Sequence, residues 1–281
     1  MRVYLPVCIN ERASARHPMR SLLLMPTLSR YLSIMEAPDV KEVHVRLQKL
    51  GNGQKAQFLK RFFKTGPGQY GEGDIFLGIR VPELRALANE YRHLTHREVP
   101  PLLRSPLHEE RLFALLVLAR TFSKGTEAVR AQIYELYMAN TAYINNWDLV
   151  DLSAPQIVGA FLADRSKQPL YDFAGSSSLW ERRIAVLATF HFIRSGKFSE
   201  TLKIVKMLLA DKEDLIHKAA GWMLREIGKR DLECEEVFLR EHCRGMPRTM
   251  LRYAIERFPE SRRRMYLDGS AANSSARVIS A

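Results

Sequence analysis

Residues 198–229 read FSETLKIVKMLLADKEDLIHKAAGWMLREIGK, and this stretch decides the fold class. Apolar residues recur in it three and four positions apart, which is the spacing of one face of an α-helix. A short charged connector separates the two helical segments, 198–210 and 213–229. Runs of β-branched residues with a two-residue period are scarce here and elsewhere in the chain. The stretch therefore predicts two successive helices.

The same pattern continues in both directions along the chain. It predicts helices over 55–64, 82–91, 107–121, 125–139, 147–163, 180–194, 231–242 and 247–257, with 107–121 apolar nearly all round and therefore buried. Paired helices at about 40 residues per pair are typical of HEAT-like repeats. We therefore predict an all-α superhelical solenoid with a concave basic groove. The repeat prediction depends on the rhythm of the helices, because sequence self-similarity is weak.

One stretch interrupts this rhythm: residues 66–80 read GPGQYGEGDIFLGIR. Its glycines would suit a phosphate-binding loop, but no strand precedes them and no Gly-Lys-Ser/Thr follows. We therefore expect a surface loop between two helices. Tyr70 in this loop is either an exposed contact residue or a packing anchor.

The two ends of the chain differ in composition from the middle. Residues 1–35 carry five arginines and one acidic residue, which fits an organelle transit peptide. The alternatives are a poorly ordered extension, or a mis-called start with translation beginning at Met35. We favour these alternatives over the transit peptide. Residues 269–281 are small and polar, which predicts a disordered tail. One helical domain is expected over 36–268.

The charge of the chain points to a polyanionic partner. Lys and Arg number 43 and Asp and Glu 31 among 281 residues, which gives a net charge of +12 and a pI of about 9.8. Such an excess favours nucleic acid or an anionic membrane surface. A hydrophobic content of 46% excludes wholesale disorder, and no apolar run approaches the ~20 residues of a membrane-spanning helix.

Several kinds of chemistry have no support in the sequence. The three cysteines have no CxxC spacing, which argues against a disulfide framework or a thiolate zinc site and favours a reducing, cytoplasmic setting. The eight histidines are scattered, and no Gly-x-Ser-x-Gly motif occurs. We therefore expect no metal and no organic cofactor.

The first chemically suggestive group is Asn145-Asn146-Trp147-Asp148-Leu149-Val150-Asp151. Trp147 and Asp151 lie four residues apart and share one helical face, whereas Asp148 points about 100° away. Asp151 lies in an apolar stretch and is expected to be partly buried. Because an unpartnered buried carboxylate is unfavourable, Asp151 is either paired in a structural salt bridge or functional.

Two further groups follow at the spacing of the repeats. They are Trp180-Glu181-Arg182-Arg183 and Gly221-Trp222-Met223-Leu224-Arg225. Arg183 lies 36 residues after Trp147, and Trp222 lies 39 residues after Arg183. In a solenoid of about 40 residues per repeat, this spacing places equivalent helices side by side. The three groups could therefore share one surface.

The last basic segment, 244–264, holds seven arginines and two glutamates. Arg248 and Arg252 lie one helical turn apart, with Tyr253 beside them. Arginines on a helix face suit phosphate contacts, but a solvated helix face explains them equally well.

These motifs, in this order and at this spacing, resemble those of the DNA alkylation repair glycosylases of HEAT-like repeats, the AlkD type. The resemblance covers residues 38–267 and depends on residues 71–82, 146–151, 180–183 and 218–225. It implies removal of cationic N-alkylated bases, such as 7-methylguanine and 3-methyladenine, from duplex DNA by a monomeric, monofunctional enzyme. The AlkD type is understood to hold the lesion in an open cleft; the sequence leaves open whether the base is flipped into a pocket.

The resemblance also implies roles for individual residues. Asp151 matches the catalytic aspartate, and Trp147 and Trp222 match aromatic residues that line the cleft. Arg225 and Arg183 match arginines that contact the DNA backbone, although Arg182 beside Arg183 leaves that assignment one residue uncertain. Tyr70 is a weaker match. The alternative function is a helical-repeat module that binds DNA or RNA structures without catalysis, and a weaker one is a protein-interaction scaffold.

Overall fold

The regular structure of the chain is helical throughout the part that a computed structural model describes, residues 38–270. Within that range the only β-type pairing is one isolated bridge between Ile75 and Leu107. The all-α prediction is therefore confirmed. The predictions for residues 1–35 and for the last residues of the tail lie outside the described residues. The first half contains α2 (Pro38–Leu50), α3 (Gly53–Phe62), α4 (Val81–Glu90), α5 (Pro100–Leu103), α6 (His108–Lys124), α7 (Glu127–Met138), η1 (Thr141–Tyr143) and α8 (Trp147–Asp151).

The second half continues the series without interruption. It contains η2 (Pro155–Gly159), α9 (Gln168–Ala174), α10 (Leu179–Ala188), α11 (Phe190–Arg194), α12 (Ser199–Met207), α13 (Asp214–Gly228), α14 (Leu232–His242), α15 (Arg248–Ala254), η3 (Ile255–Arg257) and α16 (Glu260–Leu267). Helices α2, α5, α9 and α16 were not among the predicted segments, whereas 66–80 has no regular helix, as predicted.

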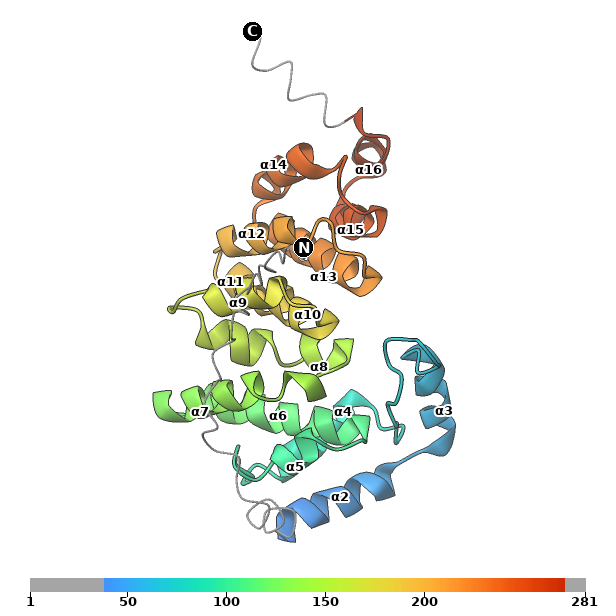
Figure 1. The fold of residues 1–281 in the computed structure, drawn as a ribbon, viewed down its shortest axis with the longest axis vertical. Helices are drawn as coiled ribbons and strands as arrows, with labels where there is room; N and C mark the ends of the chain where they lie inside the picture. The colour runs from blue at the N-terminus through green and yellow to red at the C-terminus, as the bar shows by residue number, and fades with distance from the viewer. Residues whose placement is uncertain (1–37, 271–281) are drawn as a thin grey trace, which may run out of the picture.

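The helices stack along one long axis, from α2 at one end to α16 at the other (Figure 1). Helix α8 packs against α10, α10 against α13, and α13 against α15. These four helices therefore form a row, and it is this row that carries Trp147, Arg183 and Trp222. The arrangement is that of a helical solenoid, and the spacing argument from the sequence holds. Helix α3 and the loop after it lie beside the stack, next to α8 and α10 in Figure 1.

The prediction of one continuous helix over 147–163 is wrong. Helix α8 ends at Asp151, turns follow, and a π-helical segment begins at Pro155. Proline has no N–H to donate, and its ring clashes with the carbonyl four residues earlier, here that of Asp151. The break leaves Asp151 at the last turn of a short helix.

A continuous apolar core runs through the stack. Residues 112–118 of α6 are all buried, which confirms the prediction of a buried helix there. The last repeats are held together by a close backbone approach at Gly221. A Cβ atom at this position would lie 2.3 Å from the carbonyl oxygen of Met250 and 2.6 Å from the Cβ of Tyr253. Only glycine lets α13 and α15 pack this closely.

We expect Gly221→Ala to lower the free energy of unfolding by about 1–3 kcal/mol, because the new methyl group meets backbone atoms of α15 that cannot move aside. Urea denaturation would measure the change. Gly175→Ala is the matched control: its Cβ would meet nothing closer than 3.7 Å, so its stability should stay within about 0.5 kcal/mol of wild type. Equal stability of the two variants would contradict the packing argument.

Candidate active site

The row of helices α8, α10, α13 and α15, with α3 and the loop that follows it, encloses a pocket of about 520 Å³. Six of the residues predicted from the sequence line it: Tyr70, Trp147, Asp151, Arg183, Trp222 and Arg225. The remaining lining residues are Phe62, Lys64, Leu215, Lys218 and Tyr253. The three sequence groups thus meet at one place, as their spacing predicted.

Asp151 lies in this pocket in a two-point ion pair with Arg183. The Arg183 Nε donates to Oδ1 at 2.9 Å and its Nη2 donates to Oδ2 at 2.8 Å. The third nitrogen, Nη1, donates to the carbonyl of Leu215 on α13 at 2.6 Å. Arg182 points elsewhere, with its Nε 2.6 Å from Asp211. Of these two neighbouring arginines, Arg183 is therefore the one that lines the pocket, and it ties α8, α10 and α13 together.

The surroundings of Asp151 make its negative charge unfavourable. Its side chain is 14% exposed. Burial raises the pKa of Asp151 above its usual range, the adjacent Arg183 lowers it in part, and the charge of Asp148 raises it further. An adjoining apolar pocket of about 760 Å³ shares Phe62, Trp147, Asp151 and Trp222 with this site, so the carboxylate borders a surface with few polar groups. Such a carboxylate is poised to stabilise a positive charge placed next to it.

Several aromatic rings line the same pocket as Asp151. Trp147 stacks on Phe63, with ring centroids 5.1 Å apart and planes 14° apart, and meets the edge of Phe62 at 6.0 Å. Trp222 donates its indole N–H to Glu226 Oε1 at 3.2 Å, which fixes its orientation. Tyr70 packs edge-on against Trp180 at 6.1 Å. Of the two predicted alternatives for Tyr70, the packing anchor therefore describes its contact in the free protein.

The predicted arginines divide into two sets. Arg225 lines the pocket and pairs with Glu256, while its buried Nε has no hydrogen-bond partner among residues 38–270. Arg248 and Arg252 are exposed on α15 and do not line the pocket. Arg248 donates to the carbonyl of Leu267 at 2.6 Å, so it joins α15 to α16. The structure therefore does not bring this last pair together with the aspartate.

Three polar pocket residues were missed by the sequence reasoning: Lys64, Lys218 and Tyr253. Lys218 lies four residues before Trp222, so helical spacing alone could have placed it on the same face. It forms an ion pair with Asp214 at 2.7 Å, which raises the pKa of Lys218. Lys64 follows α3 with a φ of 51°, and no motif in the sequence marks it. These residues add positive charge to the rim of the pocket.

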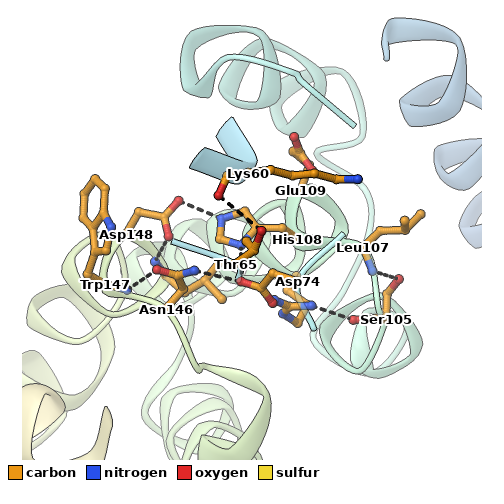
Figure 2. A network of polar contacts seen from close by, with 12 residues as sticks. Lys60, Thr65, Asp74, Ser105, Leu107, His108, Glu109, Asn146, Trp147 and Asp148 are labelled. Carbon is orange, nitrogen blue, oxygen red and sulfur yellow. Dashed lines mark hydrogen bonds and ion pairs between the residues drawn. The ribbon is translucent and has the colours of Figure 1, made fainter. Parts of the chain in front are cut away.

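A buried polar network lies beneath the stack of Trp147 on Phe63, which we call the aromatic wall. The sequence reasoning missed this network as well (Figure 2). His108, 2% exposed, is its centre. The His108 Nε2 lies 2.8 Å from Asp148 Oδ2, and its Nδ1 lies 3.3 Å from Asp74 Oδ2. Asp74 also accepts from Arg111, and from the Asn146 side chain at 2.7 Å. The network joins α6 and α8 to the loop over 66–80.

A second buried acid fixes the same loop through its backbone. Glu109 accepts the N–H groups of Leu77, Gly78 and Ile79 at 2.9, 2.8 and 3.2 Å. Gly78 has a φ of +85°, and a Cβ there would lie 2.3 Å from the carbonyl oxygen of Asn52. The signal for this arrangement is present in the sequence: residues 108–111 are all charged or polar, yet they open an otherwise apolar helix.

The network has a definite charge state. Burial lowers the pKa of His108, but the carboxylates of Asp148 and Asp74 outweigh that effect and raise it to about 9. The pKa of Asp74 is lowered by His108, Arg111 and Asn146 acting against burial. At neutral pH the ring is therefore an imidazolium, and two cations balance two carboxylates.

No group of three or more His, Cys, Asp or Glu side chains within 38–270 is arranged to hold a metal ion. None of the described helices is long and apolar enough to cross a membrane.

The fold and the site together define a helical-repeat protein with a carboxylate between aromatic rings on a basic surface. Residues 43–258 match the family model of DNA alkylation repair enzymes, and the chain belongs to this family. A solved structure described as a predicted DNA alkylation repair enzyme from Enterococcus faecalis superposes with a TM-score of 0.60. It shares 20% identity over 75% of this chain and 97% of that chain, a likeness that shows the fold alone. The comparison with curated proteins gave no match.

Because folding raises the pKa of His108 from 6.5 to about 9, its stabilising contribution is complete below pH 6.5 and is lost as the pH rises through 9. We therefore expect the free energy of unfolding to fall between about pH 6.5 and pH 9, by at most about 3 kcal/mol from this group. Urea denaturation at pH 6, 7.5 and 9 would measure the fall, which should be smaller in His108→Gln. Equal falls in both proteins would refute the assignment of the charge to His108.

Proposed function

We propose that this protein is a monofunctional DNA glycosylase of HEAT-like repeats, acting in base excision repair. It hydrolyses the N-glycosidic bond of cationic N-alkylated purines, such as 7-methylguanine and 3-methyladenine, in duplex DNA. The observation that carries the proposal is the position of Asp151. Its carboxylate lies in a pocket between Trp147 and Trp222, with basic side chains around the rim.

The chemistry fits a single carboxylate. An N-alkylated purine already carries a positive charge and leaves readily, so no general acid is required to protonate it. Positive charge develops on the sugar as the bond to the base breaks, and a carboxylate beside C1′ stabilises that charge or orients a water molecule toward it. The neighbouring tryptophan rings attract the polarised sugar by about 0.5–2 kcal/mol each. Asp151 must be ionised for this role, and the pairing with Arg183 favours the ionised form.

The basic residues around the pocket are suited to phosphate groups. Arg183 on α10, Lys218 and Arg225 on α13 and Lys64 after α3 line the pocket with the carboxylate, so they can hold the backbone on both sides of the lesion nucleotide. Exposed Arg248 and Arg252 would extend this contact along α15. Such contacts fix the register of the DNA without reading its sequence, as repair of lesions in any sequence requires.

The state of Lys218 supports a monofunctional enzyme. A glycosylase that also nicks the strand forms a Schiff base, for which a neutral amine is required. Asp214 raises the pKa of Lys218, so the amine is an ammonium ion at neutral pH. In this state Lys218 attracts phosphate but does not attack C1′.

The second candidate is a binding module without catalysis, and one observation favours it. Both oxygens of Asp151 are bonded to Arg183, as in a structural salt bridge. The two candidates differ in what they predict for Asp151→Asn. Loss of a structural pair would affect stability and binding, whereas loss of a catalytic carboxylate would affect base release.

We expect the wild-type protein to release 7-methylguanine from a duplex with a single lesion, and Asp151→Asn to release it about 100-fold more slowly, the scale for loss of one preorganised electrostatic group. Abasic sites would be counted after alkaline cleavage under single-turnover conditions. Affinity for a duplex with a tetrahydrofuran abasic site would show whether the variant still binds DNA.

Asp164→Asn is the matched control, because Asp164 is exposed and lies outside the pocket. Its ion pair with Lys197 is a surface pair in which the nitrogen and oxygen atoms are 3.9 Å apart. It should keep the wild-type rate. Wild-type protein that binds the duplex but releases neither 7-methylguanine nor 3-methyladenine would reject the glycosylase and leave the binding module.

A further inference from the structure

His108 connects the parts of the site that come from different regions of the chain. It opens α6, and its ring bonds Asp148 on α8 and Asp74 on the loop over 66–80 (Figure 2). Asp148 follows Trp147 directly and precedes Asp151 by less than one helical turn. The ring therefore contacts the short helix that presents both the tryptophan and the aspartate of the pocket.

The geometry excludes a direct role in proton transfer. Both ring nitrogens of His108 face carboxylate oxygens, and the ring packs against Phe63 and Phe76, with centroids 5.2 and 4.5 Å away. No nitrogen remains to accept a proton from water or to reach a nucleotide. What the ring can supply is a fixed position and a positive charge.

The charged groups around this ring come from α6, α8 and the loop over 66–80. Asp74 and Asp148 face its two nitrogens, Arg111 on the same helix pairs with Asp74, and Glu109 faces the loop backbone. Beyond Asp148 lies Asp151, whose own cation is Arg183 on α10. Asp148 is only 7% exposed, so its charge is poorly screened by water and acts on Asp151.

We propose that His108 is the positioning residue of the active site. Its imidazolium fixes the helix that carries Trp147 and Asp151 and cancels the charge of Asp148 beside the catalytic carboxylate. This inference rests on the proposed glycosylase function. Removing the imidazolium would leave Asp148 uncompensated and make ionisation of Asp151 harder, whereas removing the charge of Asp148 would make it easier.

The test compares His108→Gln and Asp148→Asn, whose effects on Asp151 are opposite. In the DNA-free protein, ¹³C NMR of the Asp151 carboxyl, assigned with Asp151→Asn, should show its titration moving to higher pH in His108→Gln and to lower pH in Asp148→Asn. The acid limb of the pH–rate profile for single-turnover release of 7-methylguanine should move to higher pH in His108→Gln and to lower pH in Asp148→Asn. His108→Gln should also slow release at its optimum by about 10- to 100-fold, the scale for a small displacement of a reacting group.

The double variant His108→Gln/Asp148→Asn separates charge from simple damage to the fold. With both charges removed, the pKa of Asp151 should return toward that of wild type. If His108 only stabilised the fold, the shift in the double variant would be at least as large as the larger of the two single-variant shifts. Glu109→Gln is the matched control, because it loosens the same loop but should leave the Asp151 titration unchanged.

The outcomes distinguish this inference from the proposed function. Shifts of the Asp151 titration in the same direction in both single variants, or no shift in either, would overturn the role of His108 even if wild type is an active glycosylase. The predicted opposite shifts in a wild-type protein that releases no base would uphold the electrostatic role and reject the glycosylase.

Discussion

The two-point ion pair between Asp151 and Arg183 is the interaction on which the site depends. It joins α8 to α10, and through the Leu215 carbonyl it reaches α13, so three successive repeats meet at one guanidinium. It also offsets part of the desolvation that raises the pKa of this buried carboxylate. A carboxylate held in this way is preorganised, and no solvent reorganisation is needed when positive charge appears beside it.

A second group of buried charges, which also compensate one another, lies beneath the aromatic wall. Asp74, Asp148, His108 and Arg111 balance one another in a region with little access to water, and removal of one member would leave its partners uncompensated. The network ties the loop over 66–80 and, through it, α3 to the row of repeats. The stack of Phe63 on Trp147 depends on that attachment. The aromatic wall is therefore positioned by electrostatics below it as well as by its own packing.

Much of this arrangement could be predicted from the sequence, because solenoid repeats convert sequence spacing into spatial adjacency. The separation of Trp147, Arg183 and Trp222 placed them in one row, and the pocket contains all three. The break at Pro155 was missed because the apolar period runs through it, although the missing N–H forbids a regular helix. The partners of His108 could not be foreseen, since they lie 34 and 40 residues away, on a loop and a helix whose relative position depends on the whole fold. In the sequence, Arg248 and Arg252 of α15 resemble the pocket arginines Arg183 and Arg225. Only the contacts in the folded protein distinguish the two pairs.

The central claim is that Asp151 faces a sugar that becomes positively charged, and a charged sugar mimic tests it directly. The measurement is the affinity for two duplexes that differ only in one nucleotide, a cationic 1-aza-2′-deoxyribose or a neutral tetrahydrofuran. The account predicts that wild type binds the cationic duplex at least about 100-fold more tightly, as expected for a mimic of the transition state, and that Asp151→Asn loses this preference. Equal affinity of wild type for the two duplexes would contradict it.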